Sequence, residues 1–138
     1  MNSRYLLVGV LVLAIVLFGS FRVVQITGSA SSAGGNQQVK VIIDDGVKVS
    51  TYDIALIKME TAFDALKHVA TVDSDYSTNY ITGINGKMED GKSNHYWLFF
   101  VNDKMPNVGS DSFYPVTGDV IKFRYVDINS EHVADYLQ

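Results

Sequence analysis

The chain has 138 residues, of which 11 are basic and 15 acidic, and it contains no cysteine. Two of the basic residues, Arg4 and Arg22, flank an N-terminal apolar segment, so the rest of the chain is more acidic than the overall net charge of −4 indicates. This balance gives no electrostatic reason to bind nucleic acid or anionic lipid. The lack of cysteine excludes disulfides, thiolate metal sites and a lipoprotein anchor.

The segment from Tyr5 to Phe21 carries no charge. At ~1.5 Å of rise per residue, a helix of this length is ~25 Å long, at the short end of what spans a bilayer. Arg4 precedes it, which favours a cytoplasmic N-terminus. We therefore predict a signal-anchor transmembrane helix over residues 1–22 and a single-pass cell-membrane protein with an extracytoplasmic domain. Cleavage near the small residues Gly28 and Ala30 is the alternative, and it would give a secreted protein.

Residues 23–38 include the stretch GSASSAGGNQQ, which is small and polar and is typical of a flexible linker. The globular domain is expected over residues 39–127, a length that supports one small domain with one core. The remaining residues, 128–138, form a C-terminal tail too short and mixed in character to assign.

Two strands and one helix are predicted in the first half of the domain. Residues 39–43 are β-branched and end at an Asp-Asp-Gly turn, and residues 47–57 form a second, less regular extended stretch. The period then changes, because apolar residues over 60–70 recur at helical spacing. We expect a helix of about three turns there, with a capping box formed by Thr61 and Asp64.

The second half of the domain reads as further strands. Residues 80–84 alternate as a strand and lead into Asn85-Gly86, a turn signal that tolerates positive φ. A polar loop is expected over 87–94, and residues 96–101 (YWLFFV) are apolar on both sides, as in a central strand. Residues 120–126 form the last strand. The predicted fold class is α+β, a mainly antiparallel sheet with one packed amphipathic helix, preceded by the transmembrane helix.

Catalytic and metal-binding patterns are weak. The three histidines, His68, His95 and His132, share no metal-ligand spacing. The run Asp73-Ser74-Asp75 hints at a calcium loop, but it lacks the glycine and the distal glutamate of such a loop, so an acidic turn is the better interpretation. No hydroxyl has an adjacent base at motif spacing. We predict a protein that is not an enzyme and has no metal site.

The order of the segments is more specific than any one of them. The run TAFDALKHVA, then YITGING, YWLFFVND and VGSDSFYPVTGDVIKFRY, resembles the β-domain of the transcobalamin and intrinsic factor family over roughly residues 39–126. That domain also occurs in prokaryotic surface proteins. In the cobalamin carriers of the family it closes over the corrinoid, while a separate helical barrel forms the main body of the site. This chain contains no such barrel.

The resemblance implies that two segments face a ligand, residues 75–80 and residues 97–106. The candidate ligand-binding residues are Asp75, Tyr76, Tyr80, Trp97, Phe99, Asn102, Lys104, Met105 and Pro106. The residue types agree, because a large planar ligand needs apolar and aromatic walls and a few amide groups that orient it. Core packing is an equally good explanation for any single aromatic residue of the strand.

Two functions follow from these observations. The first is a membrane-tethered extracytoplasmic ligand-binding module for cobalamin or another corrinoid, whose site is completed by a partner protein such as a helical barrel or a transporter. The second is a cell-surface module that keeps only the fold and either binds protein or cell-wall material or has a structural role. Neither function involves nucleic acid.

Overall fold

The computed structural model describes residues 36–129. The predicted signal anchor over 1–22, nearly all of the linker over 23–38 and the tail from residue 130 onward lie outside these described residues. Within 36–129, no helix is long and apolar enough to cross a membrane.

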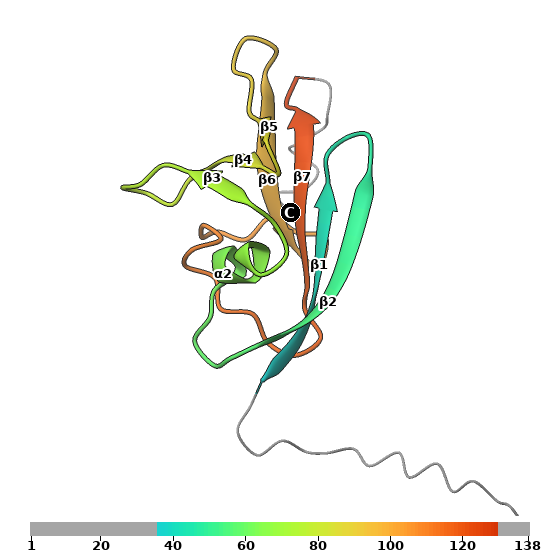
Figure 1. Cartoon of the computed structure of the whole chain (residues 1–138), viewed down its shortest axis with the longest axis vertical. Coiled ribbons are helices and arrows are strands. Elements are labelled where there is room, and N and C mark those ends of the chain that lie inside the picture. Colours follow the sequence, from blue (N-terminus) through green and yellow to red (C-terminus); the bar gives the residue numbers. More distant parts are fainter. Residues whose placement is uncertain (1–35, 130–138) are drawn as a thin grey trace, which may run out of the picture. The chain divides into compact units, whose positions relative to one another are not determined.

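A four-stranded sheet forms the centre of the domain (Figure 1). Its spatial order is β2-β1-β7-β6, with β1 spanning Gln37–Asp44, β2 Val49–Leu56, β6 His95–Val101 and β7 Val120–Asp127. The β1–β2 and β6–β7 pairs are antiparallel, whereas β1 and β7 are parallel. The sheet is therefore mixed, and the prediction of mainly antiparallel pairing is confirmed with this one exception.

A second, three-stranded sheet was not predicted. It has the order β3-β4-β5 and consists of Val72–Ser74, Ile81–Ile84 and Lys87–Met88. β4 and the turn after it are confirmed, because Asn85 and Gly86 have φ of 51° and 80° and close the β4–β5 hairpin. Strand β5 lies where a loop was expected, and β3 lies in a polar stretch that showed no strand pattern.

The single described helix, α2 (Ala62–Lys67), is shorter than the predicted 60–70. The predicted capping box is confirmed: the Thr61 hydroxyl accepts a hydrogen bond from the Asp64 amide at 3.2 Å, and the Asp64 carboxylate accepts one from the Thr61 amide at 3.1 Å. The helix ends at the cap residue His68. After it the chain turns, because the amide groups of Val69 and Ala70 both donate to the Leu66 carbonyl. The predicted length was therefore wrong by more than one turn.

The core lies between one face of the larger sheet, α2 and β4. Alternation along the strands sends inward-facing residues of four strands to the same side, and the cluster of buried residues comprises Val39, Val41, Ile43, Leu56, Ala62, Phe63, Ala65, Leu66, Ile81, Ile84, Trp97, Ile121 and Phe123. Phe63 and Leu66 thus face the sheet, and they form the apolar side of the predicted amphipathic helix. Their burial, together with that of Ala65, fixes α2 against the sheet.

Strand β6 lies at an edge of the sheet, so its prediction as a central strand was wrong. A strand that is apolar on both faces must be covered on both faces. It can still lie at the edge of a sheet, with a neighbouring strand on one side only. Trp97 and Phe99 face the core that contains α2, while Phe100, on the opposite face, is also buried at 3% exposure. The two central strands are β1 and β7, whose parallel pairing joins distant parts of the chain.

Candidate ligand groove

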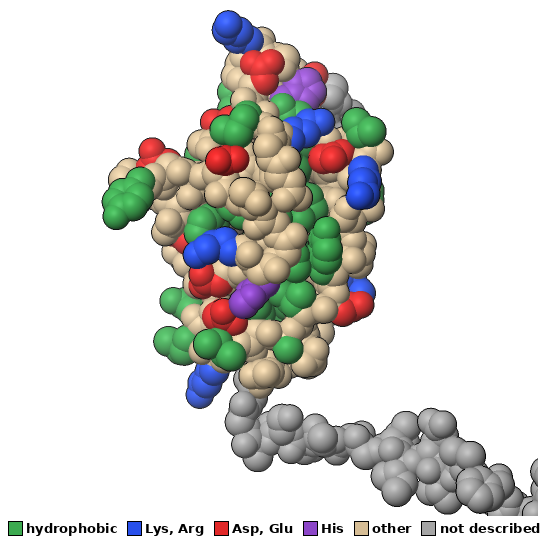
Figure 2. Space-filling model, in the orientation of Figure 1, with side chains coloured by type: hydrophobic (Ala, Val, Ile, Leu, Met, Phe, Trp, Pro, Cys, Tyr) green, Lys and Arg blue, Asp and Glu red, His purple; other side chains and the backbone are tan. Residues whose placement is uncertain are grey.

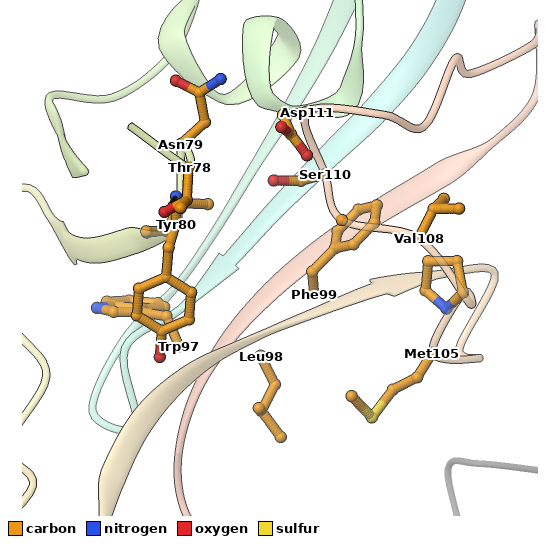
Figure 3. A pocket seen from close by; sticks show the side chains of 13 residues that line it. Thr78, Asn79, Tyr80, Trp97, Leu98, Phe99, Met105, Val108, Ser110 and Asp111 are labelled. Atoms are coloured by element: carbon orange, nitrogen blue, oxygen red, sulfur yellow. Dashed lines mark hydrogen bonds between the residues drawn. The ribbon is translucent and has the colours of Figure 1, made fainter. Parts of the chain in front are cut away.

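A groove of about 570 Å³ runs along β6 (Figure 3). Its walls come from the start of β4, from β6, and from the loop that follows β6. The residues that line it are Thr78, Asn79, Tyr80, Ile81, Trp97, Leu98, Phe99, Met105, Pro106, Val108, Gly109, Ser110 and Asp111. We call Ile81, Trp97 and Phe99 the groove floor, because they also belong to or pack on the core. We call Tyr80, Met105, Pro106 and Val108 the groove rim.

A tight turn after β6 brings the rim into place. Asn102 and Asp103 both have positive φ, 51° and 63°, and the main-chain groups of Val101 and Lys104 bond to each other at 2.8 and 3.0 Å. This is the geometry of a two-residue hairpin turn, which asparagine and aspartate tolerate well. The turn sends the chain back, so that Met105 lines the groove beside β6.

The Asn102 side chain fastens this turn to β7. Its amide nitrogen donates to the Asp119 carboxylate at 2.8 Å, and its amide oxygen accepts from the Val120 main chain at 2.9 Å. Both ends of the amide are therefore engaged within the protein. Asn102 holds the turn that carries the rim and does not line the groove.

The loop over residues 109–113 closes the end of the groove next to α2. The Ala62 amide donates to the Phe113 carbonyl at 2.8 Å, and the Phe63 amide donates to the Ser110 carbonyl at 2.9 Å. These are two of the amide groups that a helix N-terminus leaves without an internal partner. The loop therefore satisfies the start of α2 while it places Ser110 and Asp111 at the groove.

The opposite wall depends on the β3–β4 loop, which extends away from the larger sheet in Figure 1. One carboxylate oxygen of Asp75 accepts from the main-chain amide groups of Ser77 and Thr78, at 2.9 and 3.1 Å, and from both of their hydroxyls. These hydrogen bonds, with those of Ser77 the strongest, lower the pKa of Asp75. Asp75 thus organises the loop internally, and Tyr76 stands fully exposed within it.

Tyr80 forms the rim at the end of that loop. Its hydroxyl donates to the Glu89 carboxylate at 2.9 Å, and its side chain remains 48% exposed. Burial of part of the phenol, followed by the hydrogen bond to Glu89, raises the pKa of Tyr80 to about 12. Tyr80 is therefore a neutral phenol at physiological pH, with its ring edge at the groove.

Two of the three floor residues, Trp97 and Phe99, are aromatic, and their rings pack into or against the core. Trp97 is 6% exposed, and its indole nitrogen donates to the Lys87 carbonyl at 2.9 Å. Its ring centroid lies 5.2 Å from that of Tyr125. Phe99 packs between Phe113 and Phe123, at centroid distances of 5.9 and 5.4 Å. A ligand would meet the faces and edges of these rings, because the only polar atom among them is already engaged.

The structure brings five of the nine predicted ligand residues to the groove: Tyr80, Trp97, Phe99, Met105 and Pro106. It does not bring the other four there: Asp75, Tyr76, Asn102 and Lys104. Of the lining residues that were not predicted, Thr78, Asn79 and Leu98 fall within the two expected segments. The stretch from Val108 to Asp111 was outside them, although its sequence VGSD belongs to the segments that carry the resemblance.

Charge does not gather at this site. Among the lining residues that the structure describes, Asp111 is the one ionisable acid or base apart from the Tyr80 phenol. Figure 2 shows acidic and basic side chains interspersed among hydrophobic ones over the face that it draws. Among residues 36–129, no group of three or more histidines, aspartates and glutamates is placed to hold a metal ion. The two described histidines lie elsewhere, with His68 bonded to Glu60 and His95 to Ser93.

Comparisons with known proteins agree with the fold. Residues 60–127 match the family described as "Domain of unknown function (DUF4430)". A protein from Ruminococcus gnavus ATCC 29149, proposed to bind metal, is similar in structure with a TM-score of 0.55 and 13% identity, over 65% of this chain and 96% of that one. Haptocorrin in complex with Cbi is similar with a TM-score of 0.60 and 13% identity, over 67% of this chain.

The match to haptocorrin covers only 25% of that protein. No curated protein matches the chain. At 13% identity the two structural similarities establish a shared fold alone. The chain is thus similar in fold to one part of haptocorrin, as the resemblance to the transcobalamin family implied, and it is similar in sequence over residues 60–127 to a family whose function is not defined.

Proposed function

We propose that the chain is a membrane-tethered, extracytoplasmic ligand-binding module, and that cobalamin or another corrinoid is the ligand of its groove. The observation that carries this proposal is the groove itself. It is open and mostly apolar, it has an aromatic floor, and it lies between the two segments that the resemblance assigned to a ligand. Its volume of about 570 Å³ falls within the range of small-molecule sites.

The lining suits a large, flat ligand with polar groups at its edge. The floor offers ring faces and edges for apolar contact, while Asn79, Ser110 and Asp111 supply polar groups at the boundary. The groove is open to solvent on one side, so a corrinoid bound there keeps one face in water. A partner protein, either a helical barrel or a transporter, is proposed to cover that face. The match covers only 25% of haptocorrin, which supports a site that is shared between this domain and a second protein.

The proposed role is binding without catalysis. General acid–base or nucleophilic chemistry needs a nucleophile and a base within hydrogen-bond reach. The groove contains the Ser110 hydroxyl and the Asp111 carboxylate, but neither described histidine lines it. The Asp111 carboxylate is placed beside the Ser112 hydroxyl, at 3.4 Å.

Fluorescence of Trp97, the only tryptophan of the chain, tests the proposal directly. The full-length protein in detergent micelles is titrated with cobalamin, and N-acetyl-tryptophanamide serves as the control for light that the corrinoid absorbs. We expect quenching that saturates and that exceeds the control. Quenching identical to the control up to millimolar cobalamin would rule out this ligand class.

The membrane topology needs its own test. Protease added to intact protoplasts should degrade the domain, whereas full protection would contradict an extracytoplasmic location. The intact mass of the mature protein separates the two N-terminal alternatives. A mass that begins after Ala30 would mean that the segment is a cleaved signal peptide and that the protein is secreted.

A second candidate function is protein interaction at the cell surface. It is favoured by Tyr76, a large aromatic residue that is fully exposed in a loop braced by Asp75. Exposed aromatic residues of this kind often anchor protein interfaces. A neighbouring gene for a helical barrel or a corrinoid transporter would favour the first function, and genes for adhesins or wall proteins would favour the second.

A further inference from the structure

The groove borders the unpaired edge of β6. Within residues 36–129, strand β6 has one neighbouring strand, β7, which pairs along one of its edges. Three consecutive residues, Trp97, Leu98 and Phe99, line the groove, although neighbouring side chains in a strand point to opposite faces. Figure 3 shows Trp97 and Phe99 on one side of the β6 ribbon and Leu98 on the other. A groove that touches all three must therefore run along the edge of the strand.

The hydrogen-bond pattern identifies which main-chain groups face this edge. The amide of Asn102 bonds to Val120 of β7, whereas the amide of Val101 bonds away from β7, to Lys104. At the other end of β6, the amide and carbonyl groups of His95 also bond away from β7, to Asp90. Main-chain groups alternate in direction along a strand. The amide and carbonyl groups of Trp97 and Phe99 therefore point outward to the groove.

These four main-chain groups have no hydrogen-bond partner among residues 36–129. Unpaired groups of this kind are a template for an additional strand. At the two ends of this edge, His95 already pairs with Asp90 and Val101 with Lys104, so no further strand can pair there. The free stretch is therefore two outward-facing residues long, which suits a short extended peptide. A second copy of β6 carries the same closing segments at its own ends, and these would collide with those of the first.

The charge of the groove lining indicates which side chains a bound peptide should carry. Among the described residues, Asp111 is the one carboxylate that lines the groove, and no basic side chain of residues 36–129 lines it. Glu89 lies behind the rim, bonded to Tyr80. A segment that pairs with β6 places alternate side chains over the apolar floor, so apolar residues suit those positions. A lysine or arginine next to them complements Asp111.

We infer that the free edge of β6 is a docking site for an extended peptide segment of another protein, which pairs with the main chain of Trp97 and Phe99 and carries a basic residue toward Asp111. This goes beyond the proposed corrinoid ligand and does not depend on it. A peptide bound in this way would occupy the same groove, so the corrinoid and the peptide would exclude each other.

A pool of randomised seven-residue peptides provides the probe, selected on the immobilised full-length protein in detergent. We expect the retained peptides to combine alternating apolar residues with a lysine or arginine. The tightest peptide is then remade in two N-methylated forms, one methylated at the residues that face β6 and the other at the residues that face away. The first form should bind about tenfold more weakly, because it loses main-chain hydrogen bonds, and the second should bind almost unchanged.

Equal loss in both N-methylated forms, or no peptide retained at millimolar concentration, would overturn the inference. Asp111→Asn should remove the preference for a basic residue, while Asp53→Asn, at an exposed position on β2, is the matched control.

Amide hydrogen exchange gives a second readout. In the free protein the Trp97 and Phe99 amide groups should exchange faster than that of Leu98, and the peptide should slow both. Protection of Trp97 and Phe99 without any peptide would contradict the open edge.

Discussion

The floor and the rim of the groove differ in what the fold requires of them. Trp97 and Ile81, in the floor, are 6% and 7% exposed and contact the core, so any ligand site they form is built on residues that the protein needs in order to fold. Tyr80 and Val108, in the rim, are 48% and 47% exposed. Aromatic residues in a buried strand are therefore poor evidence of function by themselves. The rim is where binding can be separated from stability.

The floor should show the largest loss of stability. Trp97→Ala removes a buried ring and the hydrogen bond to the Lys87 carbonyl, so we expect it to lower the free energy of unfolding by ~3–5 kcal/mol. Urea unfolding followed by circular dichroism measures this without tryptophan fluorescence. Tyr76→Ala is the control, because Tyr76 is fully exposed, and it should change stability by less than about 0.5 kcal/mol. Equal effects at both positions would contradict the assignment of Trp97 to the core.

Helix α2 should show the next largest loss of stability. Leu66 is fully buried, and Leu66→Ala should cost ~2–5 kcal/mol in the same measurement. Lys67, its neighbour on the exposed side, pairs with Asp64 at 3.7 Å between exposed groups. Lys67→Ala should therefore change stability by less than about 0.5 kcal/mol. If the two substitutions cost the same, the buried face of α2 is misassigned.

The helix cap contributes less than the core. Thr61→Ala removes the hydroxyl that accepts from the Asp64 amide, and caps of this type contribute about 1 kcal/mol. Thr61→Ser keeps the hydroxyl and is the matched variant, so it should recover most of the loss. Thermal unfolding of the three proteins tests this. A cap that contributes nothing would imply that the loop over residues 109–113 alone fixes the start of α2.

The rim should affect binding and leave stability nearly unchanged. Met105 is partly exposed, and Met105→Ala removes contact area at the groove without opening the core. We expect about fivefold weaker binding of cobalamin, with a change in stability below about 0.5 kcal/mol. Trp97 quenching and thermal unfolding measure the two effects. A rim substitution that lowers only the melting temperature would show that the groove is merely the surface of the core.

The phenol of Tyr80 should show the smallest effect. Because the pKa of Tyr80 is raised to about 12, the neutral phenol is favoured in the folded state. Its contribution is fully present below the ordinary tyrosine pKa of about 10 and is lost as the pH rises toward 12. Phenolate absorbance measured against pH should lose a late-titrating component in Tyr80→Phe. If Tyr80→Phe instead loses a phenolate component that titrates near pH 10, Glu89 and burial do not act on this hydroxyl.

Local patterns predicted local structure well. The capping box and the Asn85-Gly86 turn depend on residues within a few positions of each other, and both were read correctly. The place of β6 in the sheet could not be read in this way. It depends on β7 pairing in parallel with β1, and Lys40 and Val120, which pair there, are far apart in the sequence. The short strands β3 and β5 were missed because none of their residues is buried.

For the groove too, local patterns were predictable from the sequence, whereas contacts between distant segments were not. The resemblance indicated the two segments that border the groove, and it included Trp97 and Phe99 among the candidate ligand-binding residues. Asn102 was a candidate ligand-binding residue, because a large planar ligand needs amide groups that orient it. Its actual partners, Asp119 and Val120, become visible only once the register of β6 on β7 is known. Asp111 was missed because the loop that carries it is placed by contacts with α2.

We propose that the groove, rather than another surface of the domain, receives the ligand. Amide and indole chemical shifts of the full-length protein in micelles, recorded during a cobalamin titration, test it most directly. We expect saturating shifts at the Trp97 indole and at Tyr80, Met105 and Val108, while Lys40 of β1 and Asp53 of β2 remain unchanged. Shifts that gather at Lys40 and Asp53, or no shifts up to millimolar cobalamin, would contradict it.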